Sequence, residues 1–175
     1  STRLIGAIIM THGDERDLRL PPHIAPIQVV IVPVAAHKGG VMEQCDAVAS
    51  ALKAAGLRVK MDDRDTLSPG FKFNDWELKG VPVRLEIGPR DIENGVATVF
   101  RRDTCEKSTL ALDTLATELP ALLEAIQKEL FEQAKRFRDE KITDAHTLDE
   151  LKTIVDGGFA RAMWCGERAC EDQIK

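Results

Sequence analysis

The chain has 175 residues, of which 43% are hydrophobic and 30% are charged, and its formal net charge is -5. This composition is typical of a globular protein with a real core, and it excludes a disordered chain. The longest apolar run, 29–34, is too short to cross a bilayer, and the negative charge argues against a protein that binds nucleic acid by bulk electrostatics.

The predicted elements begin with an apolar stretch, 4–10, which is followed by a charged turn and which we interpret as the end of a helix. The β-branched run 28–34 predicts a strand that is buried on both faces. Apolar residues then recur at helical spacing from Val41 to Ala55 and stop at Gly56. This pattern predicts an amphipathic helix with a glycine stop.

The same alternation of strand and helix continues along the chain. Residues 57–61 predict a second strand, 71–78 a short helix and 83–87 a third strand. Strand, helix, strand, helix, strand is the signature of an α/β sheet with parallel pairs. Residues 96–102 alternate loosely and end in charge, which predicts a further strand at the sheet edge. We therefore expect an α/β fold with a mixed, largely parallel sheet flanked by helices.

The C-terminal third is predicted to be mainly helical. An apolar stripe at helical spacing runs over 119–137, and Pro120 is tolerable in the first turn of such a helix. Thr147 and Glu150 have the spacing of a capping box, which predicts a last helix after them. After residue 159 the chain becomes rich in aromatic residues and cysteine, which indicates the start of a separate unit that is cut short.

Residues 58–107 carry ten basic and ten acidic side chains, and near the strand ends they combine charge with aromatic rings. The ends of strands in an open α/β sheet are where ligands bind. Rings stack on unpaired bases, carboxylates accept hydrogen bonds from N1 and N2 of guanine, and arginine donates to O6 and N7. The candidates are Phe73, Trp76, Glu77, Arg84, Arg90 and Asp91. The alternative, which spacing alone favours, is a core pair of rings beside surface ion pairs.

A second candidate site is the acidic group Asp62, Asp63 and Asp65, which could hold Mg²⁺ in a phosphoryl-transfer domain. Acidic residues that alternate with Arg64 more often form a salt-bridged turn, and we prefer that interpretation. The four histidines show no spacing of a ligand set or a catalytic triad, and no serine lies in a nucleophile elbow. The sequence therefore does not support nucleophilic catalysis.

The four cysteines do not resemble a secreted disulfide framework, so a reducing cytoplasm is expected. Cys165 and Cys170 have a spacing compatible with half of a four-ligand zinc site. Two thiols leave half of the coordination shell open, and the alternative is a pair of reduced thiols. We therefore expect no stoichiometric zinc on these residues alone.

Several longer motifs resemble prolyl-tRNA synthetases of the archaeal and eukaryotic type, and the resemblance runs from residue 1 to residue 175. The motifs are Ser1-Thr2-Arg3, His12-Gly13-Asp14, Leu18-Arg19-Leu20-Pro21-Pro22, Ala25-Pro26-Ile27-Gln28-Val29, Gly70-Phe71-Lys72-Phe73, Trp76-Glu77-Leu78-Lys79-Gly80-Val81-Pro82, Gly88-Pro89 and Trp164-Cys165-Gly166. Two positions depart from the family pattern. Asp17 stands where relatives usually carry glycine, and Arg90 stands where lysine is frequent, which keeps the charge and changes the donor geometry.

The resemblance implies a division of the chain into three parts. Residues 1–24 would be the end of a class II catalytic domain, in which Arg3 matches the arginine that contacts ATP. Residues 25–140 would form the anticodon-binding domain, with its helical continuation. Residues 141–175 would be the start of a C-terminal zinc-type domain, in which Cys165 and Cys170 match the first two zinc ligands.

The resemblance also implies a function. It places anticodon contacts on Phe73, Glu77, Arg84, Arg90 and Asp91, in a protein that attaches proline to tRNA(Pro) with ATP and Mg²⁺. The parent enzyme would be a cytoplasmic homodimer, and this chain alone would be inactive because class II motifs 1 and 2 are missing from it. The alternative is a non-catalytic RNA-binding or partner-binding module derived from the same domain.

Overall fold

A computed structural model describes residues 2–174, so Ser1, the first residue of the motif at 1–3, and Lys175 lie outside the described residues. The chain divides into two compact units, one before and one after the boundary between Leu130 and Phe131. Within the described residues, no helix combines the length and the apolar character needed to cross a membrane.

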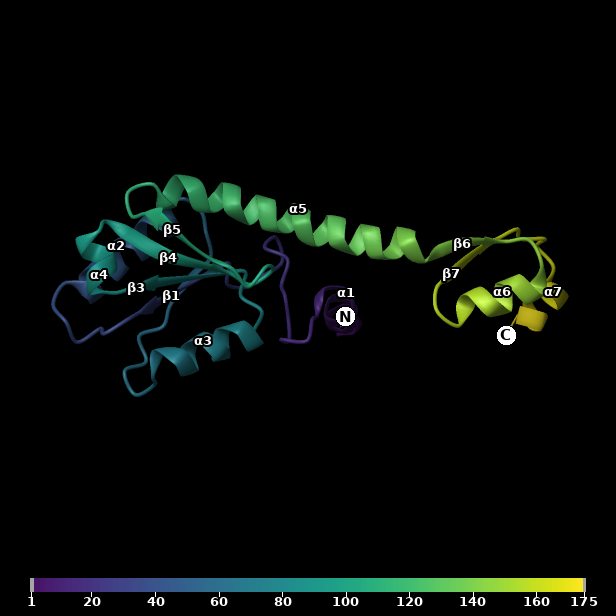
Figure 1. Cartoon of the computed structure of the whole chain (residues 1–175), viewed down its shortest axis with the longest axis horizontal. Helices are drawn as coiled ribbons and strands as arrows, with labels where there is room; N and C mark the ends of the chain where they lie inside the picture. The colour runs from purple at the N-terminus through teal and green to yellow at the C-terminus, as the bar shows by residue number, and fades with distance from the viewer. Residues whose placement is uncertain (1, 175) are drawn as a thin grey trace. The chain divides into compact units, whose positions relative to one another are not determined.

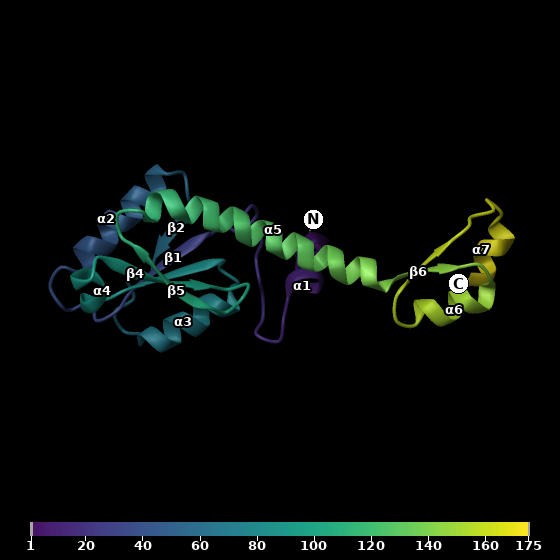
Figure 2. The same ribbon diagram turned by 45° about the horizontal axis from the view of Figure 1, so that its top comes forward.

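The first unit is built on a five-stranded sheet with the order β2-β1-β3-β4-β5 (Figures 1 and 2). Its elements are α1 (Arg3–His12), β1 (Val29–Pro33), α2 (Val41–Ala54), β2 (Val59–Met61), α3 (Pro69–Leu78), β3 (Val83–Ile87), α4 (Pro89–Glu93), β4 (Val96–Arg101), β5 (Lys107–Ala111) and the start of α5 (Leu115–Lys141). Strand β1 pairs in parallel with β2 and β3, whereas the pairs β3-β4 and β4-β5 are antiparallel. The predicted α/β fold with a mixed sheet is confirmed.

The structure corrects four details of the prediction. Strand β4 is not an edge strand, because β5 pairs with its outer side. Helix α1 is a complete helix of 10 residues rather than a helix end. Helix α5 begins at Leu115, so Pro120 lies inside the helix and not in its first turn. Phe137, at the end of the predicted apolar stripe, is 62% exposed.

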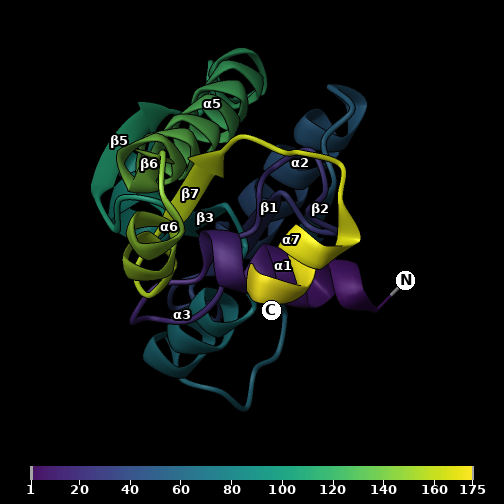
Figure 3. The same ribbon diagram turned by 90° about the vertical axis from the view of Figure 1, so that its right-hand side faces the viewer.

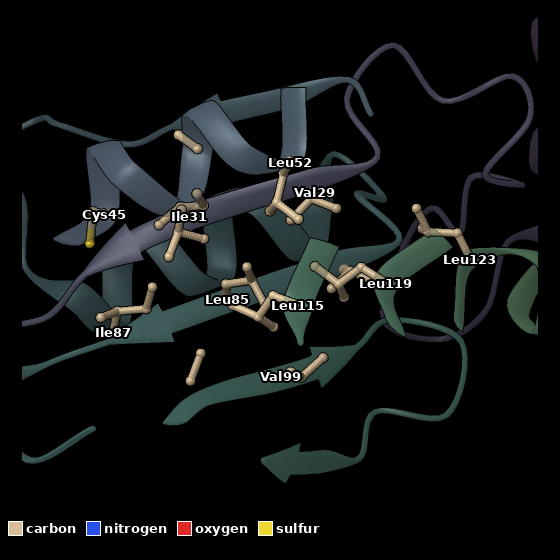
Figure 4. Close-up of a cluster of buried hydrophobic side chains, with 14 of the residues drawn as sticks. Val29, Ile31, Cys45, Leu52, Leu85, Ile87, Val99, Leu115, Leu119 and Leu123 are labelled. Atoms are coloured by element: carbon tan, nitrogen blue, oxygen red, sulfur yellow. The ribbon is translucent and has the colours of Figure 1, made fainter. Parts of the chain in front are cut away.

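One face of the sheet carries the main hydrophobic core (Figure 4). Strand β3 contributes Val83, Leu85 and Ile87, which are all fully buried. Helices α2 and α5 cover this face with apolar stripes that include Leu52 and Leu119, as expected for amphipathic helices. The long stretch of β-branched residues in β1 is buried along its whole length, because the sheet is covered on both faces there.

Helix α3 covers part of the opposite face, where a smaller apolar cluster contains Val30, Val32, Trp76 and Val81. The helix begins with a cap, in which the hydroxyl of Ser68 accepts a hydrogen bond of 3.3 Å from the backbone N–H of Phe71. Besides this small apolar cluster, a polar contact joins α3 to the sheet, since Arg84 on β3 donates to Glu77 on α3.

The second unit contains the end of α5, β6 (Ile142–Ala145), α6 (Leu148–Val155), β7 (Phe159–Ala162) and α7 (Arg168–Ile174). Strands β6 and β7 pair in parallel and lie beside each other in Figure 3. The predicted capping box of Thr147 and Glu150 is present at the start of α6. The residues after 159 therefore do not begin an isolated unit, because β7 pairs with the strand that precedes α6.

Candidate nucleic-acid interface

The second face of the sheet carries a group of charged and aromatic side chains beside α3. The register aligns Arg84 on β3 with Phe100 on β4, and Phe100 with Lys107 on β5. Glu86 lies two residues after Arg84 and therefore on the same face. Helix α3 adds two side chains above these strands. We call these six residues the Arg84 cluster: Phe73, Glu77, Arg84, Glu86, Phe100 and Lys107.

Arg84 lies at the centre of the cluster and is 3% exposed. Its NH1 donates to Oε1 of Glu77 at 2.8 Å, and its Nε and NH2 donate to Oε1 of Glu86 at 3.1 and 3.0 Å. The guanidinium carbon lies 4.3 Å from the ring centre of Phe73 and 4.2 Å from that of Phe100. The charge is thus held between two rings, and two carboxylates lie in hydrogen-bonding contact with it.

The cluster is balanced in charge. Lys107 donates from Nζ to Oε2 of Glu86 at 2.8 Å, and the same Nζ lies 5.4 Å from the ring of Phe73. Two cations therefore face two carboxylates, as buried charges require. The side chains of Glu77 and Lys107 are 23% and 50% exposed, so an acceptor and a donor of the cluster reach solvent together.

The structure brings three of the five predicted anticodon contacts together and separates the other two. Phe73, Glu77 and Arg84 are in direct contact. Arg90 and Asp91 follow the opposite end of β3, and the strand alone spans about 10 Å between residues 84 and 87. Arg90 is exposed, whereas the carboxylate of Asp91 accepts a hydrogen bond of 2.8 Å from the backbone N–H of Gly88. Asp91 thus caps the start of α4.

Three members of the cluster were missed by the candidate set drawn from the sequence. Glu86 has a usable signal, since it shares the face of Arg84 by strand alternation. Phe100 is recognisable only once β3 and β4 are paired, and Lys107 only once β4 and β5 are paired, because both are far from Arg84 in sequence. The missing strand β5 therefore explains the absence of Lys107 from the candidate set.

The acidic group after β2 is a salt-bridged turn. The side chain of Asp62 is fully buried, and it accepts hydrogen bonds from Arg64 at 2.6 and 2.8 Å and from Nε1 of Trp76 at 2.7 Å. Burial alone would raise the pKa of Asp62, but the hydrogen bonds from Arg64 and Trp76 outweigh it and lower the pKa to about 2. The preferred interpretation of this turn is confirmed, and Trp76 is buried rather than available for stacking on a base.

The remaining predicted site residues lie apart from the Arg84 cluster. Arg3 lies exposed in the first turn of α1. Cys165 and Cys170 are exposed free thiols, and hydrogen bonds from the backbone N–H of Glu167 and from Cys170 lower the pKa of Cys165. Within the described residues, no group of three or more His, Cys, Asp or Glu side chains could hold a metal. Two thiols supply only half of a closed zinc site, so the residues present do not fit that ion.

Comparisons with known proteins agree with this geometry. A family model described as "Anticodon binding domain" matches residues 28–122, which is more than half of the chain. The chain is 56% identical to a proline-tRNA ligase of Alkaliphilus oremlandii and 52% identical to proline-tRNA ligase 2 of Clostridioides difficile. Both matches cover 100% of this chain and 37% of the relative, so the chain spans little more than a third of these enzymes.

A solved structure shows the same fold. The prolyl-tRNA synthetase of Cryptosporidium parvum, complexed with L-proline and AMP, superposes with a TM-score of 0.90 at 41% identity, over 99% of this chain and 38% of that one. The predicted resemblance to prolyl-tRNA synthetases is confirmed for the anticodon-binding domain. Clostridial enzymes and the Cryptosporidium enzyme both match along the chain, so the matches do not separate an archaeal and eukaryotic type. The chain therefore belongs to the anticodon-binding domain family.

Proposed function

We propose that this chain reads the anticodon of tRNA(Pro) within a longer proline-tRNA ligase, and that the Arg84 cluster makes the contact with guanine. The observation that carries the proposal is the pairing of Arg84 with Glu77 between two rings, with Glu77 and Lys107 reaching solvent. A buried ion pair of this kind is a poor way to gain stability, because desolvation offsets much of the attraction. The binding of a ligand explains better why this ion pair is present.

The chemistry of guanine fits both signs of charge in the cluster. Proline anticodons end in two guanines, and each presents N1 and N2 as donors and O6 and N7 as acceptors. Glu77 supplies a carboxylate for the donors and Lys107 supplies a donor for the acceptors, while the buried Arg84 holds the Glu77 carboxylate from below. The half-buried ring of Phe73 offers a surface on which a base can stack.

The proposal extends to the rest of the predicted sites. Arg90, exposed at the start of α4, and Asp91 would contact a second nucleotide, and Arg3 would contribute to an ATP site completed by other parts of the longer protein. ATP with Mg²⁺ would there activate the carboxyl group of proline for transfer to tRNA(Pro). Because class II motifs 1 and 2 are not among these residues, we expect no prolyl-adenylate formation by residues 1–175 alone.

We further propose that the longer protein is a homodimer of the archaeal and eukaryotic type that works in the cytoplasm. Four free cysteines support a reducing compartment. The division at residues 24 and 140 belongs to the same proposal, and so does a zinc-type domain that would begin at residue 141. In that domain, Cys165 and Cys170 would be joined by two further ligands.

The test measures the binding of a proline anticodon stem-loop and of a second stem-loop in which inosine replaces the two guanines of the anticodon. Inosine lacks only the 2-amino group, so the ratio of the two dissociation constants measures the reading of that group. Glu77→Gln should reduce this ratio by a factor that corresponds to about 1 to 3 kcal/mol of binding free energy, the usual discrimination of a good base contact. Glu43→Gln, at an exposed glutamate on α2, is the control. An unchanged ratio in Glu77→Gln would contradict the proposal.

A further inference from the structure

Arg102 directly follows β4 and is a deeply buried charged residue, with 1% of it exposed. Its NH1 and NH2 donate to the two carboxylate oxygens of Asp14 at 2.9 and 2.7 Å. NH2 also donates to the backbone carbonyl of Arg16 at 2.8 Å, and NH1 lies 3.8 Å from Sγ of Cys105. Nε donates to the backbone carbonyl of Glu77 at 3.4 Å. All five N–H donors of the guanidinium thus have protein partners. The side chain of Arg102 therefore has a structural role, in which it links the turn at 14–16 to Glu77.

The segment that receives Arg102 is a tight turn between α1 and the sheet. Asp14 and Asp17 exchange two backbone hydrogen bonds of 2.9 and 3.1 Å, and the carboxylate of Asp14 also accepts from the backbone N–H of Arg16 at 2.8 Å. Gly13 is required at the start of this turn, because a Cβ there would lie 2.6 Å from the carbonyl oxygen of Ile9. The turn therefore presents the Asp14 carboxylate in one orientation.

The other partner of Arg102 is the last turn of α3. The final carbonyls of a helix lack partners within the helix and carry its negative end, where a cation is stabilising. Helix α3 has no basic residue in its own last turn, so the cation comes from Arg102 instead. A second attachment lies close by, since the backbone N–H of Leu20 donates to the carbonyl of Gly80 at 3.0 Å.

We propose that Arg102 and Asp14 are positioning residues for anticodon reading, which hold the last turn of α3 so that the Glu77 carboxylate stays in place beside Arg84. Glu77 is held at its carboxylate by Arg84 and at its carbonyl by two donors, the backbone N–H of Gly80 at 2.9 Å and Nε of Arg102 at 3.4 Å, of which only Arg102 ties the turn to the segment at 13–17. If the last turn of α3 frays, the Glu77 carboxylate is no longer held in the position that guanine binding requires. The inference rests on the proposed function, and it makes discrimination depend on the turn at 13–17.

The experiment compares two neighbouring arginines in the stem-loop assay. Arg102→Lys keeps the charge but loses the planar fork that reaches Asp14 and Glu77 together. Arg101→Lys is the matched control, because the Arg101 guanidinium donates instead to the carboxylate of Asp103, at 2.7 and 3.1 Å. We expect the guanine-to-inosine ratio to fall about fivefold or more in Arg102→Lys. The ratio in Arg101→Lys should stay at the parent value.

A second background separates positioning from general stability. In the presence of Glu77→Gln, Arg102→Lys should cause no further loss of the ratio, because the group that it positions is already gone. A merely structural role would weaken binding alike in both backgrounds and leave the ratio unchanged. Asp14→Asn, which removes the charge and keeps the shape, should lower the ratio in the same direction, and it decides the question if Arg102→Lys does not fold.

Two results would overturn the inference, and they are distinguishable. If Glu77→Gln lowers the ratio while Arg102→Lys and Asp14→Asn leave it at the parent value, the proposed function stands and the positioning role is wrong. If Glu77→Gln itself leaves the ratio unchanged, both the reading by Glu77 and its positioning by Arg102 are wrong.

Discussion

The two faces of β3 bury their side chains equally and for different purposes. Val83, Leu85 and Ile87 point into the apolar core under α2 and α5, whereas Arg84 and Glu86 point to the opposite face, and all five are buried. The side chains on the core face are apolar and lose no hydrogen bonds when they are buried. The other face uses groups that require a partner for every charge. Burial alone therefore does not identify a core, because a site built on a strand can be almost as buried.

The two faces also differ in what joins the helices to the sheet. Helices α2 and α5 are joined by a continuous apolar cluster. Helix α3 is joined by a smaller apolar cluster that includes Trp76, and also by polar contacts in which Trp76 donates to Asp62, Arg84 donates to Glu77, and Arg102 donates to the carbonyl of Glu77. The core face should therefore respond to changes in volume, and the α3 face should respond to changes in charge and pH.

The largest expected effect is that of Arg84→Met, which makes one position of the α3 face as apolar as the core face. It leaves Glu77 facing an apolar side chain and deprives Glu86 of one of its two partners. Removing one partner of a buried ion pair usually costs about 3 to 5 kcal/mol in the free energy of unfolding. Denaturant titration at neutral pH would measure the loss.

Two controls sharpen this result. Leu85→Met, at the adjacent core-face residue, should cost less than about 1.5 kcal/mol because it conserves volume. Combining Arg84→Met with Glu77→Gln and Glu86→Gln should restore part of the lost stability. If Arg84→Met were as stable as the parent, the α3 face would not depend on charge pairing and the comparison would fail.

The next effect concerns acid. Asp62 has a folded-state pKa of about 2, below its usual value of 3.8, so its contribution to stability is complete above pH 3.8 and is lost as the pH falls through about 2. The contribution amounts to about 2 kcal/mol at neutral pH. Asp62→Asn should lower the stability at pH 7 by about this amount and flatten its decline between pH 4 and pH 2.

Asp63→Asn, at the exposed neighbour, serves as the control for the acid experiment. Part of the decline should remain in Asp62→Asn, because the pKa of Asp14 is also lowered to about 2, mainly by the hydrogen bond from Arg102. Thermal melts from pH 7 to pH 2 would show both components. An acid decline of the same size in Asp62→Asn and the parent would contradict the prediction.

How far the sequence predicts this molecule differs between its two faces. Periodicity alone predicts β1, α2, β2 and β3, because their apolar patterns are strong and the core face depends on them. Strand β5 was missed because its residues are mostly polar and exposed, which removes the alternation that marks a half-buried strand. The chemistry of the α3 face was recognised in Phe73, Glu77 and Arg84, with support from the family resemblance.

What could not be predicted is which polar groups contact each other. The ion pair of Glu77 and Arg84 was foreseen as the alternative to base reading, but as a pair on the surface rather than one with a buried arginine. The partnership of Arg102 with Asp14 joins residues 88 positions apart, and no local pattern records it. Such contacts depend on the pairing of strands and on turns, which single residues do not encode locally.

The smallest effect is expected at the turn that receives Arg102. Asp17 has φ 88°, a left-handed conformation that favours glycine, which agrees with the glycine that the family resemblance leads us to expect there. Asp17→Gly should stabilise the protein by about 1 kcal/mol by relieving this strain. Glu15→Gly, in the same turn, should be neutral or slightly destabilising because it only adds flexibility to the unfolded chain. A lower denaturation midpoint in Asp17→Gly would contradict the expectation.

The edges of the five-stranded sheet are protected in two different ways. Strand β2 closes one edge with only 3 residues, which is too short to serve as a template for another strand. Strand β5 closes the other edge with 5 residues, and it places a lysine and two hydroxyl side chains, Lys107, Ser108 and Thr109, along an exposed surface. Charged and polar side chains at an edge oppose strand addition by a second copy. Lys107 thus has two roles. It forms an ion pair with Glu86, and its charge opposes aggregation at the sheet edge.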